Sequence, residues 1–172
     1  QEDGDGMVQA GLIPNCRSYD PTFSYEVVTI IQHGMQRMLA EQHDEYYYVT
    51  LMNENYAHPD MPEGSAEGII KGMYLFQDAG KPKKDQLRVQ LLGSGTILRE
   101  VIAAAELLEK DFGVVADIWG CPSFNELARD GADVERHNRF HPEAKAPRKA
   151  HITALLEGRQ GPAIAATDYI RT

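Results

Sequence analysis

Two stretches near the start of the chain carry clear patterns of apolar positions. From residue 20 to about residue 41, apolar side chains recur every three or four positions, the spacing of one face of an α-helix. Asp20 and Pro21 open this stretch, and we expect the helix to begin there, because a carboxylate caps the first turn and proline fits it. Residues 14–19 predict a short strand. Residues 46–52, YYYVTLM, are β-branched and aromatic with little alternation, which predicts a strand buried on both faces of a parallel sheet. The helical stripe consists of Phe23, Val27, Ile30, Ile31, Gly34 and Met38.

The second half of the chain contains a more complete unit. Residues 87–92 predict a strand, residues 93–95 (GSG) a tight turn, and Thr96 the N-cap of an amphipathic helix. Gly113 stands where a left-handed residue would end that helix, and residues 114–119 predict the next strand. A strand, a helix and a strand in about 33 residues indicate a right-handed parallel crossover.

The remaining segments carry weaker patterns. Residues 69–76 predict a further strand or a segment that crosses between domains, and residues 152–156 and 163–166 predict two short strands. Between residues 77 and 87 the composition changes to Gly, Pro and Lys, which is typical of a linker. The sequence therefore predicts an α/β protein of two half-domains with parallel sheets, joined by this linker.

A polar cluster follows directly after the predicted strand at 46–52. It consists of Asn53, Glu54, Asn55 and Tyr56. Open α/β sheets place their ligands beyond the carboxyl ends of parallel strands, so these four residues are candidates to face a substrate. The alternative is a loop that only stabilises itself through hydrogen bonds, and the residues leave both interpretations open.

The glycine turn at 93–95 is a second candidate site. It lies between a strand and a helix start, where backbone N–H groups favour anions. A dinucleotide fingerprint would need a third glycine where Leu98 stands and an acidic residue at the end of the next strand, near Trp119. A plain tight turn is the simpler interpretation, and a nucleotide-binding domain is kept as an alternative.

Histidine and cysteine residues do not form a recognisable metal motif. His137 and His141 are four residues apart and would share one face of a helix, but a zinc site needs at least a third ligand. We expect both to face solvent. Cys16 and Cys121 lie far apart without a CxxC spacing, which indicates reduced, buried thiols.

Composition and charge exclude several classes of protein. With 42% hydrophobic and 25% charged residues, the chain has the composition of an ordinary globular protein that we expect to be cytoplasmic. A formal charge of −9 argues against nucleic acid as a partner. No apolar run approaches the roughly 20 residues that span a membrane. The cationic cluster of Lys81, Lys83 and Lys84 is typical of a solvated linker, with a docking patch as the alternative.

Five stretches, in the correct order, resemble a single family. That family is the homodimeric bacterial pyruvate dehydrogenase decarboxylase component, a transketolase-like enzyme that uses thiamine diphosphate. The resemblance covers nearly the whole chain, and the combination of its motifs is specific. The stretches are 13–27 (IPNCRSYDPTFSYEV), 46–64 (YYYVTLMNENYAHPDMPEG), 89–108 (VQLLGSGTILREVIAAAELL), 123–136 (SFNELARDGADVER) and 166–171 (ATDYIR).

The resemblance implies a place for this chain in a longer one. Residues 1–76 would form the second half of the pyrimidine-binding domain, residues 77–87 a linker, and residues 88–172 the first part of the C-terminal domain. The family's diphosphate and magnesium motif, GDG with an Asn about thirty residues later, would lie elsewhere. Gly4-Asp5-Gly6 is not followed by that Asn, since residues 33–36 are HGMQ. Thiamine diphosphate and Mg²⁺ are therefore expected in the full-length enzyme and not on this chain alone.

The resemblance also implies an activity and partners. The full-length enzyme would decarboxylate pyruvate oxidatively and pass the acetyl unit to lipoyl groups of the acyltransferase component, with the cofactor as electron sink. It would act as a homodimer. Asp3, in the EDG stretch, would face the substrate, but Asp5 and Met7 stand where the family usually has histidines. This departure favours, as an alternative, a non-catalytic module for dimerisation or docking.

Overall fold

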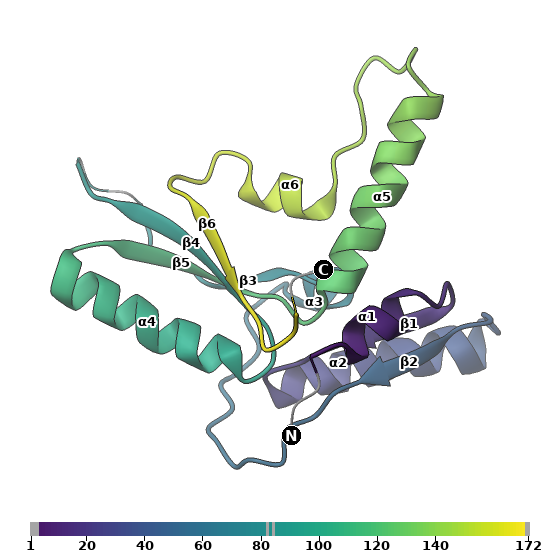
Figure 1. The fold of residues 1–172 in the computed structure, drawn as a ribbon, viewed down its shortest axis with the longest axis horizontal. Coiled ribbons are helices and arrows are strands. Elements are labelled where there is room, and N and C mark those ends of the chain that lie inside the picture. Colours follow the sequence, from purple (N-terminus) through teal and green to yellow (C-terminus); the bar gives the residue numbers. More distant parts are fainter. Residues whose placement is uncertain (1–3, 82, 84, 171–172) are drawn as a thin grey trace.

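The strands of the chain form two sheets (Figure 1). The computed structural model describes residues 4–81, 83 and 85–170. In the first sheet, β1 (Cys16–Tyr19) pairs in parallel with β2 (Tyr46–Val49). The second sheet has the order β3-β5-β4-β6, in which β4 is parallel to both of its neighbours and β3 is antiparallel to β5. Its strands are β3 (Tyr74–Gln77), β4 (Arg88–Gly93), β5 (Val115–Gly120) and β6 (Ala163–Ala166). The predicted α/β class with parallel pairing is confirmed.

Helices connect these strands and cover both faces of the second sheet. Figure 1 shows α4 on one side of this sheet and α6 on the other. None of the helices in the described ranges has both the length and the apolar character needed to cross a bilayer. The helical elements are α1 (Gly6–Gly11), α2 (Ser24–Met35) with the π-helical turn η1 (Gln36–Ala40), α3 (Ala66–Lys71), α4 (Ile97–Phe112), α5 (Phe124–Phe140) and α6 (His151–Leu156).

Alternation along the central strands explains why helices cover both faces. Val89 and Leu91 of β4 belong to a cluster with Leu98 of α4. Leu92 and Trp119 belong to a second cluster, formed with residues of α5 and α6. Because successive side chains of a strand point to opposite faces, these two clusters lie on the two sides of the sheet. Each fully buried aliphatic side chain contributes roughly 1.5–3 kcal/mol to folding.

A third cluster joins the two sheets. It combines Tyr19 of β1 and Ile30 of α2 with Ile69 of α3 and Tyr74 of β3. The side chains of Ile30 and Ile69 are fully buried. The first sheet, which has only two described strands, is therefore stabilised by the elements that lead into the second.

The predicted crossover unit in the second half is confirmed. The strands β4 and β5 are parallel and in register from Arg88 opposite Val115 to Gly93 opposite Gly120. α4 ends at Gly113, whose φ of 67° is the left-handed conformation expected there. The strand predicted at 163–166 is β6.

The start of the first long helix was predicted wrongly. The N-cap of α2 is Phe23, three residues after Asp20. The side chain of Asp20 instead accepts a hydrogen bond from the hydroxyl of Thr50. The side chain of Glu26 caps the helix by accepting from the backbone N–H of Phe23 at 2.7 Å.

Three strand predictions also need correction. The strand at 46–52 is shorter and is not buried on both faces, because its residues from Tyr46 to Val49 are half-buried or exposed. Residues 152–156 belong to the helix α6, since Ile152, Leu155 and Leu156 follow a helical spacing and pack together into the second cluster. Residues 69–76 are divided between the end of α3 and β3.

Candidate functional site

Four strands end around one cavity, which we call the strand-end cleft. The residue after β1 is Asp20, the residue after β4 is Ser94, the residue after β5 is Cys121, and the residue after β6 is Thr167. The ends of β4, β5 and β6 point toward the middle of the molecule in Figure 1. The cavity measures about 740 Å³ and is lined by Met7, Val8, Asp20, Ser94, Cys121, Pro122, Ser123, Phe124, Asn125, Ala165, Ala166, Thr167, Tyr169 and Ile170.

Strand order places this cleft where open α/β sheets hold ligands. The chain leaves β4 through α4 to reach β5 on one side, and later returns to β6 on the other side of β4. The gap between β4 and β6 is therefore a topological switch point. The hydroxyl groups of Ser94 and Thr167, the residues that follow these two strands, lie 2.9 Å apart.

Asp20 ties the end of the first sheet to this switch point. Its backbone N–H donates to the carbonyl of Pro122 at 2.6 Å, and its carbonyl accepts from the N–H of Gly95 at 3.0 Å. The hydroxyl of Thr50 donates to its carboxylate at 2.7 Å. Burial raises the pKa of Asp20, although hydrogen bonds from Thr50 and Ser94 oppose this effect. The cleft thus contains a carboxyl group that is held in place by hydrogen bonds.

Gly95 allows the close approach of Asp20. Its φ is +50°, and a Cβ at this position would lie 2.4 Å from a carboxylate oxygen of Asp20. The turn at 93–95 therefore needs glycine both for its conformation and for this contact. No bound nucleotide is required to explain the motif.

The first turn of α5 holds the N-terminal segment against the cleft. Ser123 caps α5 by accepting from the N–H of Glu126, and its hydroxyl donates to the carbonyl of Ser18 at 2.6 Å. The amide of Asn125 donates to the carbonyl of Met7 at 2.7 Å and to the hydroxyl of Ser18 at 2.6 Å. Met7, where the resemblance predicts a histidine, lies at the wall of the cleft.

The residues predicted to face a substrate lie elsewhere or outside the described chain. Asp3 is outside the described residues. Among the described residues that line the strand-end cleft, none comes from Asn53–Tyr56. Asn53, Glu54 and Asn55 are exposed, and Glu54 forms an ion pair with Arg99 at 3.5 Å. Tyr56 is half-buried, its hydroxyl donates to the carbonyl of Thr22, and the guanidinium of Arg99 lies 4.4 Å from the centre of its ring.

The polar residues of the cleft could not be recognised as a group from sequence. Asp20, Ser94, Asn125 and Thr167 are far apart in the chain, and only the strand order brings them together. One signal was available, because Asp20 and Thr167 come directly after predicted strands and Ser94 lies in the turn after another.

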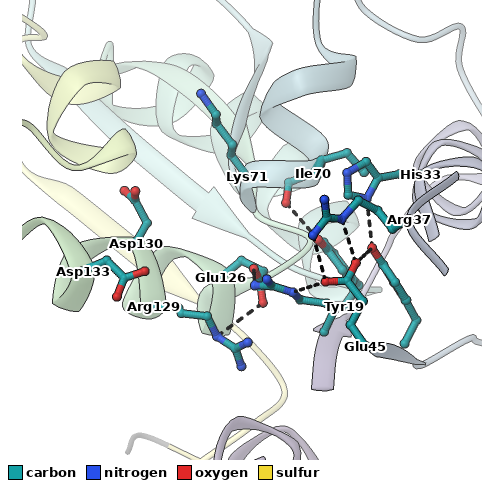
Figure 2. A pocket seen from close by; sticks show the side chains of 12 residues that line it. Tyr19, His33, Arg37, Glu45, Ile70, Lys71, Glu126, Arg129, Asp130 and Asp133 are labelled. Atoms are coloured by element: carbon teal, nitrogen blue, oxygen red, sulfur yellow. Dashed lines mark hydrogen bonds and ion pairs between the residues drawn. The ribbon is translucent and has the colours of Figure 1, made fainter. Parts of the chain in front are cut away.

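A second cavity, the charged cleft, contains a network of paired arginines and glutamates (Figure 2). It measures about 310 Å³ and lies where α5 and α3 cross the first sheet. Arg17 bridges Glu126 at 2.7 Å and Glu45 at 3.4 Å, and Arg37 contacts Glu45 at 3.0 Å. Burial alone would raise the pKa of Glu45, but hydrogen bonds from Arg37 and Tyr47 and the charges of both arginines lower it to about 2. The lining of the charged cleft is Arg17, Tyr19, His33, Arg37, Glu45, Tyr47, Ile70, Lys71, Glu126, Arg129, Asp130 and Asp133.

This network is a joint between the two sheets rather than a reactive site. Tyr47 links it to His33 through a 3.0 Å contact, and Tyr19 donates to the carbonyl of Ile70 at 2.9 Å. In Figure 2, Lys71 points away from the network, and it pairs with Glu67 at 2.6 Å. The two glutamates of the cleft, Glu45 and Glu126, are thus held by arginines.

The described part of the chain offers no metal site and no activated thiol. Within the described residues, no three His, Cys, Asp or Glu side chains are grouped so that they could hold a metal ion. The rings of His137 and His141 stack at 4.1 Å, and both cysteines are free and buried. Burial raises the pKa of the Cys121 thiol in the cleft. The strand-end cleft therefore offers polar groups that can bind and orient a ligand.

Two family models match the chain. Residues 1–59 match the "Pyruvate dehydrogenase E1 component middle domain", and residues 72–172 match the "Transketolase-like TK C-terminal domain". Solved structures of transketolase from Pichia stipitis share the fold, with a TM-score of 0.54 at 16% identity over 74% of this chain and 17% of that chain.

Relatives with much higher identity come from bacteria. The chain is 58% identical over 170 residues to a pyruvate dehydrogenase E1 component of Cupriavidus necator and 56% identical to that of Pseudomonas aeruginosa. It is 49% identical over 171 residues to that of Escherichia coli K12. Each alignment covers 99% of this chain and 19% of the relative, so the chain spans about a fifth of the length of these proteins. With both models and these relatives in agreement along the sequence, the chain belongs to the transketolase-like family of bacterial pyruvate dehydrogenase E1 components.

Proposed function

We propose that the enzyme containing this chain decarboxylates pyruvate oxidatively and transfers the acetyl unit to lipoyl groups of an acyltransferase component. The observation that carries the proposal is the 49–58% identity, across 99% of the chain, to proteins named pyruvate dehydrogenase E1 component in three bacteria. We further propose that this enzyme is a cytoplasmic homodimer.

The proposed division of the chain has residues 1–76 in the pyrimidine-binding domain, residues 77–87 in a linker and residues 88–172 in the C-terminal domain. The separate pairing of β1 with β2 supports two units. Most of β3 precedes the linker in sequence, yet it pairs with β5 of the second sheet. The two units are therefore proposed to share a strand across the boundary.

Thiamine diphosphate and Mg²⁺ are proposed to bind to parts of the enzyme outside the described residues. The support is the incomplete motif, because Gly4-Asp5-Gly6 is not followed by an Asn about thirty residues later. We therefore assign no reaction step to the cofactor on these residues. Calorimetry of this chain with cofactor and Mg²⁺ is expected to show no binding heat, and a micromolar, magnesium-dependent isotherm would contradict this assignment.

In this proposal the chain shapes the substrate side of the active centre. The strand-end cleft supplies Asp20, Ser94 and Thr167 as fixed polar groups beside an apolar wall. A site that binds and orients without its own activated nucleophile is suited to an enzyme whose cofactor supplies the reactive atom. Asp3 and the segment Asn53–Tyr56 stay proposed as substrate-facing residues.

The proposed role of the segment is tested with Glu54→Ala in the complete enzyme. If Glu54 contacts a substrate or cofactor in the transition state, the loss is about 2–4 kcal/mol, roughly thirty- to a thousandfold in kcat/KM. If it only pairs with Arg99 at the surface, stability falls by less than about 1 kcal/mol and kcat/KM is unchanged. Glu106→Ala, an exposed acid on α4, is the matched control and should change neither quantity.

A second candidate function is a non-catalytic module for dimerisation or docking. It is favoured by Asp5 and Met7, which stand where the resemblance expects histidines, and by the position of Met7 at the wall of the strand-end cleft. Release of CO₂ from pyruvate by the complete protein, with thiamine diphosphate, Mg²⁺ and an artificial electron acceptor, separates the two. Turnover supports the enzyme. The non-catalytic module is supported if the folded, dimeric protein shows no turnover and a variant carrying both Asp5→His and Met7→His gains it.

A further inference from the structure

A basic crevice lies at the opposite end of the second sheet from the strand-end cleft. It measures about 480 Å³, and its lining is Asp78, Gly80, Lys81, Arg88, Gly158, Arg159 and Gln160. Arg88 is the first residue of β4, and the other residues belong to the turn after β3 and the turn before β6. Both turns lie at the left-hand end of this sheet in Figure 1. The crevice includes Lys81 of the cationic linker, a feature that the proposed decarboxylase activity does not explain.

The floor of the basic crevice consists of two guanidinium groups around one buried carboxylate. Asp117, which is fully buried, contacts Arg88 at 3.0 Å and Arg159 at 3.5 Å. Its other hydrogen bonds come from Gln90 at 2.9 Å and from the N–H of Ala79 at 2.9 Å. Both arginines are therefore fixed in position before any ligand arrives.

The two arginines keep hydrogen-bonding capacity that the described residues do not use. The side chain of Arg88 is 7% exposed, and its Nε is buried without a hydrogen-bond partner among the described residues. Its described bonds, to Gly80 and Asp117, all leave from Nη2. The described ion pairs of Arg159, with Asp78 and Asp117, all leave from Nη1. A guanidinium has five N–H donors, and the described polar contacts of the Arg88 and Arg159 side chains leave from a single nitrogen of each.

Charge and shape favour a small anion as the ligand of the basic crevice. Lys81, Arg88 and Arg159 face two carboxylates, Asp78 and Asp117, which leaves one net positive charge in a chain whose formal charge is −9. The rim is open as well. Gly80 and Gly158 have φ values of +78° and +79°, and a Cβ at either position would meet no atom within 4 Å.

We propose that the basic crevice binds a small oxyanion, a carboxylate or phosphate group of a metabolite, among the cationic side chains of Lys81, Arg88 and Arg159 that line it. Guanidinium groups match the planar geometry of such anions, and an exposed lysine adds a point charge. This site is separate from the strand-end cleft and does not depend on the proposed decarboxylase activity.

The test is calorimetric titration of the complete protein with inorganic phosphate and, separately, with succinate, at constant ionic strength maintained with chloride. Saturable binding of one or both is expected, and the better probe identifies the source of the oxyanion. Lys81→Ala should weaken binding of the anion about tenfold, as expected for the loss of one charge-assisted contact. Arg159→Gln should weaken it further, and Lys110→Ala, an exposed lysine on α4, should leave it unchanged.

Two results would overturn the proposal. One is the absence of saturable heat with both probes. The other is binding that Lys81→Ala and Lys110→Ala weaken equally, since this would indicate general charge attraction. Because Lys81 is exposed, its replacement leaves the fold intact, and the test does not depend on the stability of the Arg159 variant.

Discussion

Glu26 is the most unusual carboxylate of the described chain, and its replacement by glutamine gives a sharp prediction. It is fully buried. One of its oxygens accepts from the N–H groups of Thr22 and Phe23 at 2.5 and 2.7 Å, and the other accepts from the hydroxyl of Tyr74 at 2.8 Å. Tyr74 in turn lies 2.6 Å from the hydroxyl of Tyr25. Glutamine can keep this arrangement, because its oxygen can accept from both N–H groups while its amide donates to Tyr74, which then donates to Tyr25.

The size of the expected change in unfolding free energy follows from the pKa of Glu26. Burial raises this pKa from its ordinary value of 4.5 to about 7, although hydrogen bonds from Phe23, Tyr74 and Thr22 oppose the effect. Because the folded state holds this proton more tightly than the unfolded state, stability falls as the pH rises through the window from 4.5 to 7. Each unit of pKa difference corresponds to about 1.4 kcal/mol, so the folding stability lost is about 3 kcal/mol, and this loss is complete above pH 7.

Equilibrium unfolding in urea, followed through Trp119, the one tryptophan of the sequence, measures this effect. The difference in unfolding free energy between Glu26→Gln and the original chain should grow by about 3 kcal/mol from pH 4.5 to pH 8, in favour of the variant. Glu26→Ala should instead destabilise at every pH, because it leaves two buried N–H groups unpaired. Parallel pH curves for Glu26→Gln and the original chain would refute the raised pKa of Glu26.

Three further predictions concern the cleft and the joint. Gly95→Ala should destabilise the protein by about 2–4 kcal/mol, because its Cβ would clash with Asp20. Gly113→Ala, also at positive φ but in open space, should cost only about 1 kcal/mol. Urea unfolding of both variants measures this difference in stability. The stability that Glu45 contributes should be present above pH 4.5 and lost as the pH falls toward 2, and Glu45→Gln should remove this acid dependence. Asn125→Ala should speed amide hydrogen exchange in α1, and unchanged exchange there would show that this side chain does not hold the helix.

Local patterns predicted the crossover unit well because each element carries its own signals. The strand before Gly93, the amphipathic helix and the left-handed Gly113 agree with one another, so no distant contact was needed to find them. The strand at 46–52 and the helix at 152–156 were misjudged because burial depends on partners. The short apolar segment 152–156 fits a strand or a helix equally well from its sequence. In the structure it is a helix, and Ile152, Leu155 and Leu156 pack against the cluster that contains Trp119.

The candidate site was less predictable, for a related reason. Asp20 looks like a helix cap in sequence, and only the return of the chain beside Gly95 shows that its carboxyl group faces the switch point. Likewise, Ser94 and Thr167 are 73 residues apart and meet only because β6 pairs with β4. Tyr56 was chosen for its position after a strand, but the contact with Arg99 that holds it comes from a helix that the pattern could not place nearby.

Reductive acetylation of an isolated lipoyl domain by the complete, folded protein tests the proposed activity directly. Thiamine diphosphate, Mg²⁺ and pyruvate are supplied, and the lipoyl domain is analysed by intact mass. A pyruvate decarboxylase of this family should produce acetyl-lipoyl domain from pyruvate and none when pyruvate is replaced by 2-oxoglutarate. An unmodified lipoyl domain after incubation with pyruvate, in the presence of protein shown to bind the cofactor, would contradict the account.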